Sequence, residues 1–371
     1  MKRVIINGAN GYVASNFINE LLTQDYEVIA LVRDSNKCSS VDRMKNALAE
    51  INEADFRVPE NLTVYGYSLL DNNFGMGQEL LEDLFSGDVD YYHFAASLKY
   101  DLKSKDEIFT TNIDGVKNSL NVYSKFSNKS SRFFFISTAY SCGKFSGVFE
   151  ERFYENEDIS KFRNYYEQSK RFAENIIREY RETKDLDIHV LRLSQVVGNN
   201  QSGVTKTDYG IFDFAKRVHG LALRNPNSKV RVRVDPESTQ NLIPIDTVVR
   251  YLMRTKEVQE LPVIMNFIAK NSTENKHIIN SLCKLLPIHI EPSESIKKED
   301  MNVVERIISI GMSFTGSYVG TNLRFDTKNL DHLISASSSY EANERTIHKM
   351  LEYFLDNLSD KKGKKVYVRA S

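Results

Sequence analysis

The amino-terminal region reads Arg3-Val4-Ile5-Ile6-Asn7-Gly8-Ala9-Asn10-Gly11-Tyr12-Val13-Ala14. Residues 3–6 form a short, β-branched and largely apolar run, which is typical of a strand buried on both faces of a parallel sheet. The glycines permit a tight turn, and the small Ala14 would let a helix, expected to run to about residue 22, pack closely on the strand. This stretch therefore predicts the first strand, turn and helix of a βαβ unit.

The same turn predicts a site for a dinucleotide. Gly8 would allow the turn itself, and Gly11 would let the backbone approach a pyrophosphate. The N–H groups and the positive dipole end at the start of the helix would face the phosphates. We therefore assign the residues of the turn to a cofactor: Gly8, Asn10, Gly11, Tyr12 and Val13.

A second apolar run, residues 26–32, completes the βαβ unit and ends at Arg33. An acidic residue at this strand end suits the ribose 2′-hydroxyl of NAD, whereas an arginine suits the 2′-phosphate of NADP. Arg33 therefore predicts NADPH as the cofactor. Arg43, on a helix expected over residues 40–50, is a second candidate for the phosphate contact and is equally consistent with a surface arginine.

Further strands and helices alternate along the first half of the chain. Strands are expected at residues 62–67, 90–96, 132–136 and 187–193, with helices at 78–85, 106–126 and about 161–180. A helix over residues 241–253 and a strand over 262–268 would return to the same domain. The alternation predicts an α/β fold with a Rossmann-type, doubly wound parallel sheet.

Small and hydroxylated residues follow two of these strands. Ala95 and Ala96 end the fourth expected strand, where a cofactor ribose would lie close to the backbone. Ser137 and Thr138 follow the fifth. The carboxyl ends of parallel strands are where open α/β sheets bind their ligands, so we expect these residues at the site.

A tyrosine and a lysine lie four residues apart in the sequence Tyr166-Glu167-Gln168-Ser169-Lys170. On a helix this spacing places Tyr166 and Lys170 on one face. A tyrosine has a pKa near 10, and a lysine cation beside it would bring the pKa of the phenol toward neutral pH. Tyr165 lacks this partner, because Ser169 lies four residues after it. An ordinary amphipathic helix can also carry such a pair.

Together these features resemble the extended short-chain dehydrogenase/reductase superfamily. The resemblance implies that Thr138, five residues before Gly143, is the catalytic hydroxyl, with Tyr166 and Lys170 as its partners. It also implies that Asn112 is the active-site asparagine and supports a proton relay. Ser137 and Lys170 would also contact the cofactor.

Finer details resemble the branch of thioester reductases and fatty acyl-CoA reductases of the male-sterility type. They are Asn73-Phe74-Gly75-Met76-Gly77, the segments 135–140 and 166–170, Arg192 to Gly198, and Leu242-Ile243-Pro244-Ile245-Asp246; the likeness covers roughly the first 260 residues. By this resemblance Ser68 and Leu69 contact the cofactor. Ser68 stands where the branch usually has Asp, and Leu193 replaces its usual proline.

Composition excludes several classes of protein. The 371 residues include 49 basic and 50 acidic side chains, so no overall charge favours nucleic acid or a membrane surface. The three cysteines, Cys38, Cys142 and Cys283, have no metal-ligand spacing, and no histidine pair forms a zinc motif, so we predict no metal. No apolar run is long enough for a signal peptide or a membrane span, which predicts a cytoplasmic protein.

We divide the chain into a cofactor-binding domain, residues 1–198 and 241–272, and a substrate-binding part, residues 199–240 and 273–358, followed by a basic tail, 359–371. In the substrate-binding part, residues 229–234 alternate between cations and valines. The alternation predicts a strand with three buried valines. Its cations are either a solvated edge or a docking ridge for coenzyme A or an acidic carrier protein.

The resemblance implies an NADPH-dependent reductase of an acyl thioester carried by coenzyme A or an acyl carrier protein, giving an aldehyde or an alcohol. An extended family member that reduces a free aldehyde or ketone, or that epimerises or dehydrates a nucleotide sugar, is the alternative. A non-enzymatic NADP-binding sensor is a third, disfavoured because Thr138, Tyr166 and Lys170 are all present.

Overall fold

The computed structural model describes residues 2–52, 58–293, 295–311, 318, 322–334 and 341–358. The chain forms two compact units. The first comprises Met1–Leu193, Val248–Phe267 and Phe325–Ala336, and the second comprises Ser194–Thr247, Ile268–Arg324 and Ser337–Ser371. The predicted basic tail, residues 359–371, lies outside the described residues.

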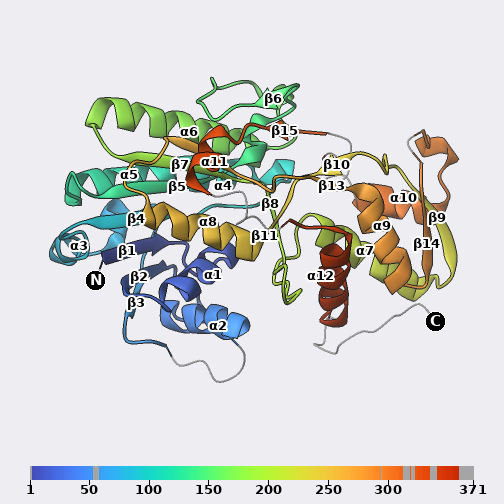
Figure 1. The fold of residues 1–371 in the computed structure, drawn as a ribbon, viewed down its shortest axis with the longest axis horizontal. Helices are drawn as coiled ribbons and strands as arrows, with labels where there is room; N and C mark the ends of the chain where they lie inside the picture. Colours follow the sequence, from blue (N-terminus) through green and yellow to red (C-terminus); the bar gives the residue numbers. More distant parts are fainter. Residues whose placement is uncertain are drawn as a thin grey trace. The chain divides into compact units, whose positions relative to one another are not determined.

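The first unit is built on a seven-stranded parallel sheet (Figure 1). In sheet order the strands are β12 (Ile264–Phe267), β7 (Ile188–Leu193), β5 (Arg132–Thr138), β4 (Val89–His93), β1 (Lys2–Asn7), β2 (Tyr26–Val32) and β3 (Leu62–Gly66). The chain runs from β1 to β3 in one direction and from β4 to β12 in the other. The predicted doubly wound α/β fold is confirmed, and its topological switch point lies between β1 and β4.

Helices cover both faces of the sheet, which explains why its central strands β4, β5 and β7 are buried along their whole length. Side chains of α3 (Gln78–Leu84), α5 (Gly115–Phe126) and α6 (Tyr165–Lys184) share a core with one face. On the other face, Phe17 of α1 (Tyr12–Leu21) packs edge-on against Tyr92, whose hydroxyl bonds Thr255 of α8 (Ile245–Glu257) at 2.8 Å. All seven residues of β5 are buried as a result.

Several expected elements differ in the structure. The helix expected over residues 241–253 begins instead as the short strand β11 (Leu242–Pro244), and α8 follows it. The expected helix over 106–126 is divided into α4 (Lys105–Phe109), a π-helical turn (Thr110–Asp114) and α5. The fourth strand ends at His93, so Ala95 and Ala96 lie in the segment after it. The remaining elements of this unit are α2 (Ser40–Asn52), the short strand β6 (Val148–Phe149) and α11 (Lys328–Leu333).

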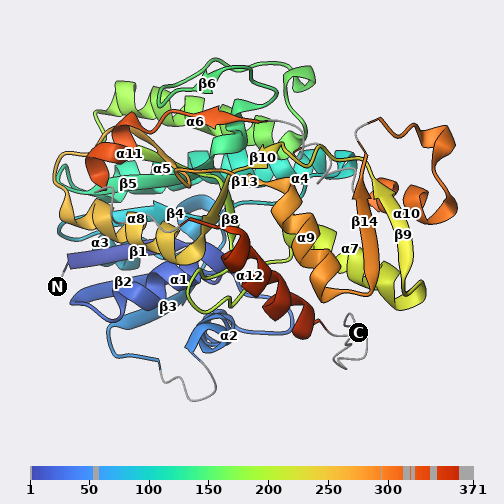
Figure 2. The ribbon, with the colours of Figure 1, turned by 45° about the vertical axis from the view of Figure 1, so that its right-hand side comes forward.

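The second unit contains a two-stranded parallel sheet of β9 (Ser228–Val232) and β14 (Ile288–Pro292), which lie side by side in Figure 2. Val230, Val232 and Val234 are buried in its core, which confirms the predicted alternation. Carboxylates pair two of the cations on the other face: Lys229 contacts Glu291, and the Arg231 Nε lies 2.8 Å from Glu305. These carboxylates neutralise the positive charges of Lys229 and Arg231, which a docking ridge would need.

Helices α7 (Ile211–Arg224), α9 (Asn275–Leu285), α10 (Val303–Gly311) and α12 (Glu344–Asp356) complete the core of the second unit. Its short strands β8 (Gln195–Val197) and β11 (Leu242–Pro244) pair in parallel, and β10 (Thr239–Gln240) and β13 (Thr273–Glu274) pair antiparallel. The short strand β15 (Arg324–Phe325) lies where the chain returns to the first unit. Among the described residues, no helix is both long and apolar enough to cross a membrane.

Candidate active site

The turn between β1 and α1 has the geometry expected of a phosphate site. Gly8 has a φ of +62°, in the region that favours glycine, and a Cβ on it would lie 2.7 Å from the Ala95 nitrogen. The Gly11 N–H donates to the Gly8 oxygen at 3.0 Å and closes the turn. Helix α1 then starts with no side-chain cap and no acidic residue in its first turn. Such a helix end suits an anion, and a dinucleotide diphosphate fits it.

Asn7, the last residue of β1, positions the switch point. Its Oδ1 accepts the N–H groups of Phe94 and Ala95 at 2.9 and 3.0 Å. These two bonds replace sheet pairing and explain why β4 ends at His93. The Asn7 Nδ2 donates to the Tyr91 hydroxyl at 2.8 Å and contacts the His93 Nδ1 at 2.9 Å. The sequence placed Asn7 in the motif but did not predict that its side chain joins the two strand ends.

The predicted arginines gather beside Tyr67, which lies just after β3. The Gly8 N–H donates to the Tyr67 hydroxyl; burial raises the pKa of Tyr67 to about 12, and the Gly8 bond and the charges of Arg33 and Arg43 oppose this rise. The Arg43 guanidinium also donates to the Arg33 carbonyl oxygen. The structure therefore brings both arginines near the turn. Tyr67 was missed because its sequence signal is that of an ordinary buried strand residue.

Ser68 and Leu69 follow Tyr67 and approach α5. The Ser68 N–H donates to the Phe74 carbonyl at 2.9 Å. Leu69 packs on Gly115, where an added Cβ would lie 2.6 Å from the Leu69 Cδ2. Asn118 donates to the Leu69 carbonyl at 2.7 Å. The Leu69 side chain is therefore part of the packing on α5, and its predicted cofactor contact stays a prediction.

Ser137 and Thr138, the last residues of β5, have different partners. The Ser137 hydroxyl donates to the Glu174 Oε1 at 2.6 Å. The Thr138 hydroxyl donates to the Leu193 carbonyl at 3.3 Å and accepts the Tyr140 N–H at 3.2 Å. Thr138 thus has the weaker donor bond of the two, and its proton is easier to redirect to a ligand.

Lys170 is buried beneath the end of β5. Its Nζ donates to the Ile136 carbonyl at 2.8 Å and lies 4.7 Å from the centre of the Phe135 ring. Burial lowers the pKa of Lys170 to about 7, and the charge of Glu174 acts in the opposite direction. Tyr166 lies one helical turn before it. Tyr165 instead meets Phe109 of α4 edge-on, with 6.0 Å between ring centres.

Asn112 lies in the π-helical turn, an irregularity that is common at functional sites. Its Oδ1 accepts the Ser97 N–H at 2.7 Å, and its Nδ2 donates to the Ser97 carbonyl at 3.1 Å and to the Ser169 hydroxyl at 2.9 Å. The asparagine therefore joins the segment after β4 to α6, one residue before Lys170. Its part in a proton relay stays a prediction.

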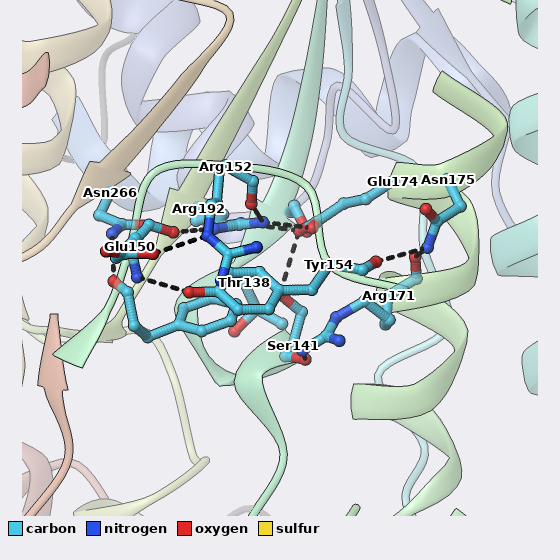
Figure 3. Close-up of polar contacts among 12 residues, drawn as sticks. Thr138, Ser141, Glu150, Arg152, Tyr154, Arg171, Glu174, Asn175, Arg192 and Asn266 are labelled. Carbon is cyan, nitrogen blue, oxygen red and sulfur yellow. Dashed lines mark hydrogen bonds and ion pairs between the residues drawn. The ribbon is translucent and has the colours of Figure 1, made fainter. Parts of the chain in front are cut away.

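A buried network that sequence reasoning missed lies beside these residues (Figure 3). Glu174 faces Arg192 of β7, with 2.7 Å between the Oε2 and the Nη2, and the Ser141 hydroxyl donates to the Glu174 Oε1 at 3.1 Å. Glu174 follows Lys170 by four residues and Tyr166 by eight, so helical spacing alone could have placed it on the same face. No group of three or more His, Cys, Asp or Glu side chains within the described ranges could hold a metal.

We expect the lowered pKa of Lys170 to make stability depend on pH. An unfolded lysine keeps its ordinary pKa of 10.5, so between about pH 7 and 10.5 the unfolded state binds more protons. The stability of the wild type should therefore rise with pH across this window relative to Lys170→Met, by roughly 1.4 kcal/mol per pH unit. Urea unfolding of both cofactor-free proteins at pH 7.5, 8.5 and 9.5 measures it; parallel curves would contradict the burial of a titrating Lys170.

The sequence and the fold are similar to those of known proteins. The sequence matches the family described as male sterility protein over residues 6–252, which is more than half of the chain. No curated protein matches the sequence significantly.

Solved structures share the fold. The terminal R domain from the myxalamid PKS-NRPS biosynthetic pathway is similar with a TM-score of 0.76 and 16% identity, covering 96% of this chain and 90% of that one. A thiolation-reductase di-domain from an archaeal non-ribosomal peptide synthetase has a TM-score of 0.74 and 18% identity, with 95% and 75% covered. UDP-glucuronic acid 4-epimerase from Bacillus cereus, in complex with NAD, has a TM-score of 0.64 and 16% identity, with 98% of each chain covered. The chain therefore belongs to the family described as male sterility protein.

Proposed function

We propose that the protein is an NADPH-dependent reductase of an acyl thioester carried by coenzyme A or an acyl carrier protein. One observation carries the proposal: Lys170 is buried against the carbonyl of Ile136, which lies two residues before Thr138 on β5, and Tyr166 lies one turn away on α6. This is the arrangement that can protonate a carbonyl oxygen. Two similar structures support a thioester substrate: one is described as the terminal R domain of a PKS-NRPS pathway and the other as a thiolation-reductase di-domain of a non-ribosomal peptide synthetase.

The dinucleotide would be held at the switch point. The turn at Gly8 and the uncapped start of α1 suit its diphosphate, and Arg33 and Arg43 suit a 2′-phosphate. When bound, the nicotinamide supplies a hydride to the carbonyl carbon.

The side chains of the chain perform the proton chemistry. Thr138 would exchange its 3.3 Å bond to the Leu193 carbonyl for a bond to the carbonyl oxygen of the substrate. Tyr166 would donate its phenolic proton to that oxygen as the carbon is reduced. The Lys170 ammonium would stabilise the phenolate that forms, because a nearby cation favours the charged form of an acid.

With a thioester, the first reduction gives a hemithioacetal. Its C–S bond then breaks and the hydroxyl proton leaves for the sulfur, which yields an aldehyde and a free thiol. A second reduction of the aldehyde would consume another NADPH and give the alcohol. In both rounds Tyr166 must be reprotonated before it can act again.

Arg33 should determine the preference for NADPH. Arg33→Ala removes a charge-assisted bond to the 2′-phosphate, worth about 1.5–3 kcal/mol, so the Kd of NADPH should rise roughly 10- to 100-fold while that of NADH changes little. Fluorescence titration of both cofactors measures this. Lys45→Ala is the matched control, because it also removes an exposed cation, in this case from α2. Equal weakening of NADPH and NADH would contradict 2′-phosphate recognition.

The proposed function is tested by following NADPH oxidation with a panel of acyl-CoA, acyl-carrier-protein, aldehyde and ketone substrates. We expect turnover of at least one thioester, with release of a thiol that a disulfide reagent detects. Turnover of free aldehydes or ketones without any thioester activity would overturn the proposed substrate class. A UDP-sugar epimerisation assay with NAD, run in parallel on the same protein, tests whether it has the activity named for the similar epimerase structure.

A further inference from the structure

Glu174 is a buried carboxylate on α6 to which the steps above give no role. Its side chain is buried almost completely. Tyr166, Lys170 and Glu174 follow one another at intervals of four residues, so they occupy one face of the helix. A buried charge costs free energy unless it is hydrogen-bonded and paired, so the partners of Glu174 indicate its role in the structure.

Four hydrogen bonds satisfy this carboxylate. The Oε1 accepts from the Ser137 hydroxyl at 2.6 Å, the Ser141 hydroxyl at 3.1 Å and the Arg192 Nε at 3.1 Å. The Oε2 accepts from the Arg192 Nη2 at 2.7 Å. Figure 3 shows Ser141 and Arg192 converging on Glu174. The carboxylate thus joins α6 to the end of β5, to the turn after it and to β7.

The two serines stand on either side of Thr138 in the chain. Ser137 precedes it directly, and Ser141 lies in the 3-10 turn that Thr138 caps. Arg192 in turn donates to the carbonyls of Glu150 and Arg152 at 3.0 and 2.9 Å. Through its bonds to Ser137 and Ser141, Glu174 therefore fixes the position of the backbone that carries Thr138.

The same carboxylate is the negative charge that acts on Lys170. Burial lowers the pKa of Lys170, and the charge of Glu174 opposes that change. His93 of β4, whose pKa burial and the charge of Lys170 lower to about 3, is neutral and adds no charge. Arg192 and Arg171 are the cations that face Glu174, and the latter donates to the Ser141 carbonyl at 2.6 Å.

We propose that Glu174 is a positioning residue of this site: its carboxylate sets the place of Thr138 through Ser137 and Ser141, and its charge holds Lys170 as the ammonium. The inference rests on the proposed reduction, in which Lys170 must be charged while Tyr166 gives up its proton. Glu174 itself touches neither the carbonyl nor the cofactor in this scheme.

The test is the pH dependence of kcat in Glu174→Gln and Glu174→Asp. Without the negative charge, Lys170 loses its proton at lower pH, so the alkaline fall in kcat of Glu174→Gln should move down by about one pH unit. Glu174→Asp keeps the charge but is too short to hold both serines, so its kcat should fall several-fold with the alkaline limb in place. A limb of Glu174→Gln that coincides with that of the wild type would overturn the proposal.

An activity-independent measurement separates this inference from the proposed function. The free energy of unfolding is measured against pH for Glu174→Gln and for Glu174→Gln/Lys170→Met. The difference between these two proteins, which is due to Lys170, should begin to rise about one pH unit lower than the difference between the wild type and Lys170→Met. An unmoved rise overturns the role of Glu174. The expected shift in a protein that reduces no carbonyl overturns the proposed function alone.

Two further variants keep the result interpretable. Glu179→Gln removes an exposed carboxylate from the same helix and should leave both pH profiles unchanged. Should Glu174→Gln fail to fold because Arg192 is left unpaired, Glu174→Gln/Arg192→Gln removes both charges and keeps amides that can bond each other. In the double variant the alkaline fall in kcat should move to lower pH by less than in Glu174→Gln, because a cation is lost as well as the carboxylate. No shift in the double variant would overturn the proposal.

Discussion

Replacing Tyr166 with Phe should lower kcat for carbonyl reduction by about 10²- to 10⁴-fold, the usual contribution of a positioned general acid. The change removes one oxygen and leaves the ring, so Lys170 should keep its bond to the Ile136 carbonyl. The Kd of NADPH should therefore change little. Single-turnover reduction of the best substrate of the panel, together with fluorescence titration of NADPH, measures both quantities.

Tyr165→Phe is the matched control for this experiment. The ring of Tyr165 contacts Phe109, and the Lys105 ammonium lies 5.3 Å from its centre, so its surroundings are those of α4. Its kcat should remain close to that of the wild type. Undiminished activity in Tyr166→Phe, or an equal loss in both variants, would refute Tyr166 as the proton donor.

Replacing Gly8 with Ala should weaken NADPH binding by about 100-fold, which corresponds to roughly 3 kcal/mol. An alanine at a φ of +62° is strained, and its Cβ would lie 2.7 and 2.9 Å from the backbone N and Cα of Ala95. Backbone atoms cannot rotate away as a side chain can. The turn must therefore move, and the N–H groups that face the diphosphate move with it.

Isothermal titration with NADPH measures this effect, and thermal unfolding of the cofactor-free protein shows whether the variant is folded. Gly220→Ala is the control, because Gly220 lies within α7 and nothing is within 4 Å of an added Cβ. That variant should bind NADPH with the affinity of the wild type and be slightly more stable, since alanine favours a helix over glycine by about 1 kcal/mol. Wild-type affinity in Gly8→Ala would show that the cofactor does not depend on this turn.

The fold was predictable because each buried strand carries its own signal. β5 contains the apolar run of residues 133–136 and is buried along its whole length, and the turn before α1 is marked by its glycines. The places where the prediction of elements was wrong have tertiary causes. β4 ends early because the side chain of Asn7 captures the N–H groups of Phe94 and Ala95.

The candidate site was predictable only in part. The five-residue segment from Tyr166 to Lys170 contains a helical spacing, and such spacing is readable from the sequence. Nothing in the sequence indicates that Tyr67 bonds Gly8 and feels the charges of the two arginines, or that the Ser137 hydroxyl donates a hydrogen bond to Glu174. A hydroxyl has one proton to donate, and its choice of acceptor depends on which helix packs beside the strand.

By itself, the sequence determined the individual buried strands, the glycine turn and the shared face of Tyr166 and Lys170, because each depends on residues within a few positions of one another. Only the tertiary structure decided that Lys170 reaches the Ile136 carbonyl, 34 residues away, and that Glu174 reaches Ser137, 37 residues away. These contacts depend on the order of the strands and on the packing of α6 against β5, which also bury Lys170 and lower its pKa to about 7. The spacing along the helix places these residues on one face, and the long-range packing determines their hydrogen-bond partners and the pKa of Lys170.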